Sequence, residues 1–96
     1  MKSVGCSMCD IYKLAIAHYG KFNQLDVAIE EMSELTKEIV KSKRGFNNRE
    51  AIVEEIADVY IMLEQLEIIF NVDLKEIIDM RNAKLKRLEE RIYSDD

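Results

Sequence analysis

Several residue types that would mark a zinc, redox or strongly kinked protein are scarce in this sequence. The chain has no tryptophan and no proline, and only three glycines, one histidine and two cysteines. Cys6 and Cys9 form a single C-x-x-C, but a zinc site needs two more ligands and His18 is the only histidine. A redox motif would follow a strand, and no strand pattern precedes these cysteines. Both cysteines are therefore interpreted as ordinary thiols.

Long apolar runs are also missing. The longest apolar region, residues 59–70, is interrupted by Glu64 and Glu67, so it is not expected to span a membrane. The first residues, "MKSVGCSMC", include a lysine but no apolar segment of the length that a signal peptide needs. We therefore expect a cytoplasmic protein without a membrane partner.

The charge balance indicates a soluble acidic domain. The chain has 96 residues, of which 34% are charged, and its net charge is −5. This length corresponds to one domain over residues 1–96. A nucleic-acid partner is not expected, because a phosphate backbone binds basic surfaces. A nucleotide is not excluded, since metal ions can hold its phosphates.

The residues that are present favour helices. Without proline the helices run uninterrupted, and apolar residues recur at spacings of three and four. Gly20 is predicted to end the first helix. Asn47 with Glu50, and Asp73 with Glu76, have capping-box spacing at the starts of the last two helices. The sequence thus predicts an all-α fold with four helices, over residues 8–18, 23–42, 47–70 and 73–93.

The third predicted helix is apolar on two sides. One stripe runs through Ile52, Val59 and Leu66, and a second includes Val53 and Tyr60. A helix that is apolar on two sides is buried on two sides, and four helices of this size do not easily cover it twice. We therefore expect the protein to form oligomers through its helices. The alternative is that the first helix and the end of the fourth cover the second stripe.

One internal repeat carries most of the functional information. The segments "IEEMSEL" (29–35) and "VEEIADV" (53–59) match position by position, with acids at the same places. Residues three apart lie about 60° apart on a helix, so Glu31 shares a face with Glu34, and Glu55 shares a face with Asp58. The second helix has an apolar stripe that includes Leu25, Met32 and Ile39. If the two helices pack antiparallel through their apolar stripes, these four carboxylates meet at one edge of the core.

Four neighbouring carboxylates repel one another, and a divalent cation relieves that repulsion. Hard oxygen ligands suit Mg²⁺ or Mn²⁺, whereas a ferritin-like di-iron site uses Glu-x-x-His, which is absent here. For a single E-x-x-E the alternative is a solvated helix face, and the second copy is what favours a metal site. The preceding acids, Glu30 and Glu54, are expected to point further toward solvent.

These motifs resemble those of the MazG-like all-α nucleoside triphosphate pyrophosphohydrolases. The family pattern is E-E-x-x-E, about twenty residues, then E-x-x-D, which here reads "EEMSE" (30–34) and "EIAD" (55–58). The resemblance extends from "HYGKFNQ" (18–24) to "RNAKLKRLEERI" (81–92). It is greatest to the short, single-domain members found in phages and Gram-positive bacteria.

The resemblance implies a fold, a partner and a reaction. The fold would be an antiparallel four-helix MazG-like bundle that forms a homodimer or a dimer of dimers. The reaction would be Mg²⁺-dependent cleavage of a nucleoside or deoxynucleoside triphosphate between its α- and β-phosphates, which releases pyrophosphate. Either Glu31 or Glu34 would be the catalytic base. The implied metal ligands are Glu31, Glu34, Glu55 and Asp58.

The resemblance also implies substrate contacts. Basic residues early in the last helix of the family meet phosphate, which corresponds to Arg81 and Lys84. Residues before the first acidic motif lie near the base, which corresponds to Gln24 and to His18 or Phe22. Several family members carry tryptophan in the base pocket, and this chain has none.

Other interpretations remain open at the level of sequence. Arg81 and Lys84 lie in a segment of alternating charges, which is typical of a solvated helix face. The whole chain could also be a non-catalytic nucleotide- or metal-binding regulator, or a helical interaction module.

Overall fold

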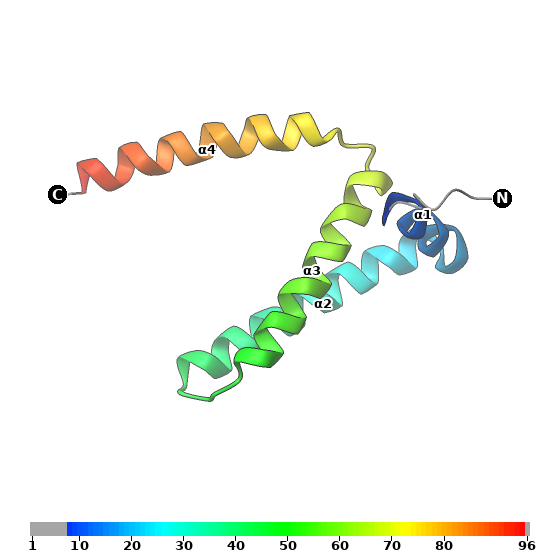
Figure 1. The fold of residues 1–96 in the computed structure, drawn as a ribbon, viewed down its shortest axis with the longest axis horizontal. Helices are drawn as coiled ribbons and strands as arrows, with labels where there is room; N and C mark the ends of the chain where they lie inside the picture. The colour runs from blue at the N-terminus through cyan, green and yellow to red at the C-terminus, as the bar shows by residue number, and fades with distance from the viewer. Residues whose placement is uncertain (1–7, 96) are drawn as a thin grey trace.

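The structure, a computed structural model, describes residues 8–95, which form four α-helices and no strand (Figure 1). The predicted all-α class is confirmed, and each predicted helix end lies within two residues of the observed one. Cys6 lies outside the described residues, and Cys9 is an exposed free thiol. The helices are α1 (Met8–Tyr19), α2 (Lys21–Lys43), α3 (Arg49–Ile69) and α4 (Leu74–Ser94).

Local signals end the helices where the sequence indicates. Gly20 separates α1 from α2 with a φ of 94°, a conformation that residues with a Cβ rarely adopt. Asn71 follows α3 with a φ of 52°, the left-handed conformation that asparagine tolerates best after glycine. The predicted capping box of α4 is present, and Glu76 Oε2 accepts a hydrogen bond of 2.9 Å from the Asp73 N–H.

The predicted capping box at the start of α3 is wrong. The residue before the helix is Asn48 rather than Asn47, and its side chain does not cap α3. The Asn48 amide instead reaches back to α2, where Nδ2 donates to the Glu38 carbonyl at 2.9 Å and to Glu38 Oε1 at 2.7 Å. The side chain therefore ties the two helices together at their connection.

Helices α2 and α3 lie side by side and run in opposite directions (Figure 1). The face of α2 that packs on α3 is not the predicted Leu25, Met32 and Ile39 stripe, since Met32 is 37% exposed and Ile39 is 47% exposed. A more polar row, whose residues are buried or half-buried, faces α3 instead. Its members are Gln24, Ala28, Glu31, Leu35 and Glu38.

Helix α1 covers one end of the α2–α3 pair. Its buried Tyr12 is hydrogen-bonded to Glu64 of α3, and burial together with the Glu64 charge raises the pKa of the phenol. Beside it, the buried Gln24 Nε2 donates to the buried Gln65 Oε1 at 2.7 Å. Besides these two glutamines, the described residues that are buried are Tyr12, Ala28 and Met62, so the core of one chain is small.

Helix α4 extends away from the other three helices and packs along none of them (Figure 1). The radius of gyration is 17.1 Å, whereas a compact domain of this length has about 12.5 Å. The chain exposes 8005 Å², and a compact monomer of the same mass exposes about 5,700 Å². The four helices therefore do not close into a compact bundle within the described part of one chain.

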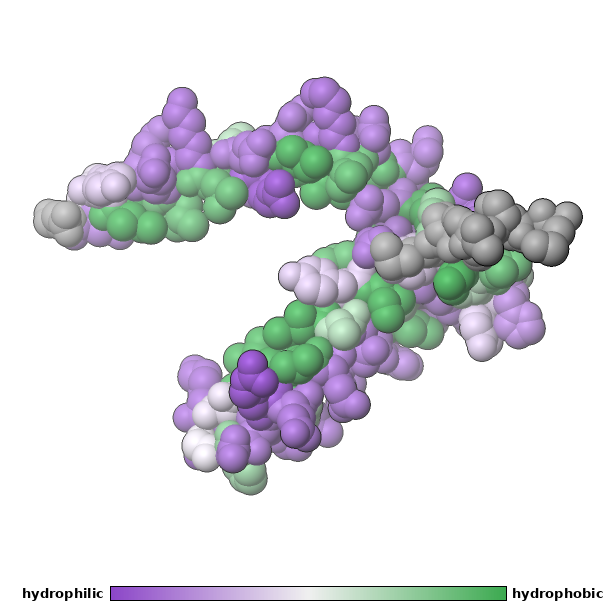
Figure 2. All heavy atoms as spheres, viewed as in Figure 1, coloured by the Kyte–Doolittle hydropathy of each residue, from purple (hydrophilic) through white to green (hydrophobic). Residues whose placement is uncertain are grey.

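Apolar side chains gather on the side of α4 that faces α3, and on the side of α3 that faces α4 (Figure 2). Polar side chains cover the outer side of α4 in the same view. None of the described helices is long and apolar enough to cross a membrane.

Ala28 tests whether α2 and α3 pack closely through the polar row. This residue is 2% exposed, so Ala28→Leu forces extra volume into the helix contact and is expected to cost about 1–3 kcal/mol of unfolding free energy. Denaturant unfolding followed by circular dichroism measures the loss. The matched control is Ala83→Leu on the exposed α4, which should cost less than about 0.5 kcal/mol. Equal losses in the two variants would contradict the packing described here.

Candidate metal centre

Three of the four predicted acids meet between α2 and α3. Carboxylate oxygens of Glu31 from α2 and of Glu55 and Asp58 from α3 all lie within 4.8 Å of one another. All three side chains are half-buried. The cluster lies within the contact between the two helices.

Helix geometry explains why these residues meet. Glu31 follows Gln24 by seven residues and precedes Glu38 by seven, so all three lie along the row that faces α3. Asp58 precedes Gln65 by seven residues on α3, and Gln65 is the hydrogen-bond partner of Gln24. The glutamine pair and the Asn48–Glu38 pair thus hold the helices in register on either side of the acids.

The carboxyls of the cluster repel one another. Partial burial, a hydrogen bond with Asp58, and the charges of Asp58, Glu55 and Glu34 raise the pKa of Glu31. Partial burial and the charges of Asp58, Glu34 and Glu38 also raise the pKa of Glu55. The carboxyls of this cluster therefore disfavour one another's ionised forms.

One oxygen of the cluster has no partner. Glu55 Oε2 is buried and accepts no hydrogen bond, although buried carboxylate oxygens are normally paired. A divalent cation would satisfy this oxygen and offset the neighbouring charges at the same time. Because all three side chains offer oxygen ligands, the site suits Mg²⁺ or Mn²⁺ better than a metal that prefers nitrogen or sulfur.

Glu34, the fourth predicted ligand, is exposed and lies outside the group of three. Its charge still contributes to the raised pKa values of Glu31 and Glu55, so it lies close enough to act on both. This position places Glu34 on the solvent side of the cluster.

The predicted substrate residues lie elsewhere. Gln24 is buried and occupied by its bond to Gln65, and His18 is exposed at the end of α1, edge-on to Tyr19 with ring centroids 4.6 Å apart. Phe22 is exposed beneath the Lys21 ammonium, 5.4 Å from the ring centroid. Arg81 and Lys84 lie on α4, which does not approach the acids within one chain.

The sequence interpretation missed two residues near the cluster, Glu38 and Gln65. Glu38 acts on Glu55 through its charge, while the Asn48 amide holds the pKa of Glu38 below its usual value. Gln65 accepts the hydrogen bond from the side chain of Gln24. The seven-residue spacings from Glu31 to Glu38 and from Asp58 to Gln65 are the sequence signal that points to both.

Comparison with protein-family models gives no match, and none is found among curated proteins or solved structures. The interpretation of the cluster therefore depends on its own geometry. Acidic groups that could hold an ion are common on protein surfaces. This cluster differs because its acids come from two helices and one of its oxygens is buried without a partner.

The raised pKa values predict an unusual pH dependence of stability. A carboxyl whose pKa is raised in the folded state stabilises the fold while it is protonated, and that contribution is lost as the pH rises through the raised value. Without metal, the melting temperature should therefore fall as the pH rises above 4.5, the ordinary value for Glu55. Added Mg²⁺ should raise it, and by more at higher pH, because the ion competes with protons.

The matched variants for this measurement are Glu55→Gln and Glu54→Gln. Glu55→Gln removes the repulsion and the ligand together, so it should melt higher than wild type without metal at neutral pH and lose most of the Mg²⁺ shift. Glu54→Gln removes only the smallest of the charges that raise the Glu55 pKa and leaves the ligand in place, so it should keep the Mg²⁺ shift. A Mg²⁺ shift that survives in Glu55→Gln would rule out this residue as a ligand.

Proposed function

We propose that the protein is a Mg²⁺-dependent nucleoside triphosphate pyrophosphohydrolase of the MazG-like type, with Mn²⁺ as an alternative ion. The observation that carries the proposal is the unpaired buried oxygen of Glu55 inside a cluster of three carboxylates from two helices. The paired acidic motifs give the resemblance to this family. The cluster supplies carboxylate oxygens, and Mg²⁺ in proteins binds a few of these together with the phosphate oxygens of a substrate.

The ion explains how an acidic site binds an anionic substrate. A triphosphate would be repelled by the cluster and by the chain's net charge of −5. Glu31, Glu55 and Asp58 would hold Mg²⁺, which would supply Lewis-acid chemistry and offset the negative charge of the phosphates. The protein's part is to hold Glu31, Glu55 and Asp58 at the fixed separation set by the α2–α3 contact.

Glu34 suits the role of general base better than Glu31. Glu31 is held by Asp58 inside the cluster, whereas Glu34 is exposed beside it and open to solvent water. A carboxylate in that position takes the proton from the attacking water and passes it to solvent. The bond that breaks joins the α-phosphorus to the oxygen that bridges to the β-phosphate, which leaves a nucleoside monophosphate and pyrophosphate.

The phosphate contacts assigned to Arg81 and Lys84 need α4 to approach α2 and α3. We infer that this requires an oligomer, a homodimer or a dimer of dimers, which would also cover the excess surface of the single chain. Gln24 and His18 would contribute to base recognition only after such an assembly changes their surroundings. The proposed location is the cytoplasm.

Release of pyrophosphate tests the proposal. The protein is incubated with Mg²⁺ and a panel of ribo- and deoxynucleoside triphosphates, and pyrophosphate and monophosphate are measured. Product is expected with at least one of them and is abolished by a chelator. Absence of product from the whole panel at micromolar protein would contradict the enzyme proposal, and a retained Mg²⁺ melting shift would then favour a metal-binding regulator.

Matched variants locate the activity in the cluster. Glu31→Gln and Glu55→Gln should each lower kcat by about 100-fold or more, since even residues that only support a metal ligand cost 10–100-fold when removed. Their exposed neighbours provide the controls, and Glu30→Gln and Glu54→Gln should stay within about threefold of wild type. Equal losses at the neighbouring positions would show that general acidity, not the cluster, supports the reaction.

A further inference from the structure

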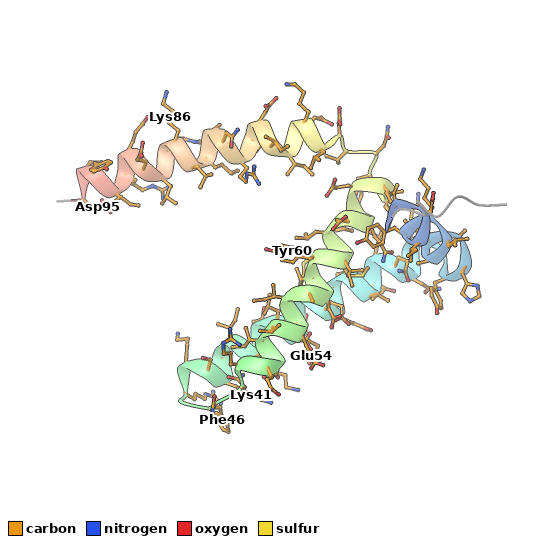
Figure 3. The ribbon with its side chains drawn as sticks, viewed as in Figure 1. Lys41, Phe46, Glu54, Tyr60, Lys86 and Asp95 are labelled. Atoms are coloured by element: carbon orange, nitrogen blue, oxygen red, sulfur yellow. The ribbon has the colours of Figure 1, made fainter. Side chains whose placement is uncertain are left out.

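The end of the α2–α3 pair that carries the connection between the two helices is basic, although the chain as a whole is acidic. Residues 37–49 contain five basic side chains and one acid, a net charge of +4, whereas the whole chain carries −5. Figure 3 places Lys41 at this end of the pair, with Lys86 on α4 across the open space. An anion that approaches from this end therefore meets cations first. The five basic residues are Lys37, Lys41, Lys43, Arg44 and Arg49.

Lys41 is the basic residue of this segment that is directed toward the acidic cluster. It follows Glu34 by seven residues, so the two side chains share one side of α2 and lie about 10 Å apart along the axis. Side chains on a helix lean toward its N-terminus, which carries the Lys41 ammonium back toward Glu38 and shortens that separation. Lys41 is half-buried, and within residues 8–95 it is the one member of the five that forms an ion pair.

Glu38 links Lys41 to the cluster. The Lys41 ammonium lies 3.6 Å from Glu38 Oε2, and the charge of Glu38 acts on Glu55 in the cluster. This ion pair is loose, because a charge-assisted hydrogen bond from an ammonium to a carboxylate is about 2.7–2.9 Å long. Glu38 Oε1 accepts a shorter bond of 2.7 Å from the Asn48 amide. Glu38 therefore keeps a partner when Lys41 leaves it, and the ammonium can exchange one anionic oxygen for another.

We propose that Lys41 leaves Glu38 and binds the terminal phosphates of a nucleoside triphosphate held at the cluster, the two phosphates that depart as pyrophosphate. The inference rests on the hydrolase function proposed above and adds the direction of the substrate. The triphosphate lies along α2, with its terminal phosphate toward the α2–α3 connection and its nucleoside toward α1.

This direction follows from the order of charges along the chain. Between Asp26 and Glu34 every charged residue is acidic. Between Lys41 and Arg49 every charged residue is basic. Terminal phosphates are therefore repelled toward one end of the helix pair and attracted toward the other. As the bond to the α-phosphorus breaks, negative charge develops on the departing oxygens, and an ammonium beside them offsets it. Lys41 offers this contact within one chain, whereas the basic residues of α4 do not.

Lys43 provides a matched control for Lys41. It carries the same charge at the same end of α2, but residues two apart on a helix lie about 160° apart, so it faces away from the side that Glu34 and Lys41 share. Lys43 is exposed, and within residues 8–95 it forms no ion pair. A general attraction between the basic segment and an anion would depend on both lysines, whereas a direct contact depends on Lys41 alone.

Calorimetric titration with inorganic pyrophosphate in the presence of Mg²⁺ tests the contact. Lys41→Met keeps the apolar stem and removes the charge, so it should weaken pyrophosphate binding by about 10- to 100-fold, the effect of one lost hydrogen bond to a charged group. Lys43→Met should bind within about threefold of wild type. A nucleoside monophosphate lacks the terminal phosphates, so Lys41→Met should bind it as wild type does. Equal losses for pyrophosphate and monophosphate would show a structural role and overturn the proposal.

Hydrolysis separates failure of this inference from failure of the proposed function. Lys41→Met should lower kcat/KM for the triphosphate by about 10- to 100-fold. It should keep the Mg²⁺ melting shift, because the metal ligands are untouched, and Lys41→Arg should recover most of the loss. If wild type hydrolyses triphosphates and Lys41→Met matches it, or Lys43→Met loses as much, only the Lys41 contact is overturned. If wild type hydrolyses none but binds pyrophosphate through Lys41, only the hydrolase function is overturned. Absence of both hydrolysis and pyrophosphate binding overturns both.

Discussion

The contact between α2 and α3 is built around carboxylates, and the rest of the structure depends on that arrangement. Helix pairs usually meet through their most apolar faces. Here the facing row of α2 contains Gln24, Glu31 and Glu38, and the facing side of α3 contains Glu55 and Asp58. Hydrogen bonds hold the two ends of the contact, whereas the centre holds acids that repel. The fold therefore keeps a local instability where a cation would remove it.

The apolar residues point elsewhere as a direct consequence. Residues two apart on a helix lie about 160° apart, so Ile29 faces away from Glu31 and Ile56 faces away from Asp58. Turning the acids into the helix contact therefore turns the apolar stripes outward. This explains why a chain that is 48% hydrophobic has so few buried residues, and why α4 finds no complete partner within it. The acidic cluster and the exposed apolar stripes thus both follow from how α2 and α3 are oriented about their own axes.

The sequence predicted what depends on neighbouring residues and missed what depends on distant ones. Helix ends at Gly20 and Asp73 follow from local backbone chemistry and were predicted correctly. Glu31, Glu55 and Asp58 were predicted from a repeat whose spacing survives in any helix. The packing face was wrong, because the prediction assumed that the longest apolar stripe faces the nearest helix. The bond from Asn48 to Glu38 joins two helices, so spacing within one helix gave no sign of it.

Ion binding and association would act on opposite faces of the same two helices. A cation would stabilise the side of the α2–α3 pair where carboxylates repel, and a partner would stabilise the side where apolar stripes are exposed. The cation and the partner both require the same register of α2 against α3. The small core of one chain holds this register weakly. Each would therefore favour the conformation that the other binds, which is the condition for positive coupling between two sites. Assembly of the proposed oligomer and binding of a metal ion would then each strengthen the other.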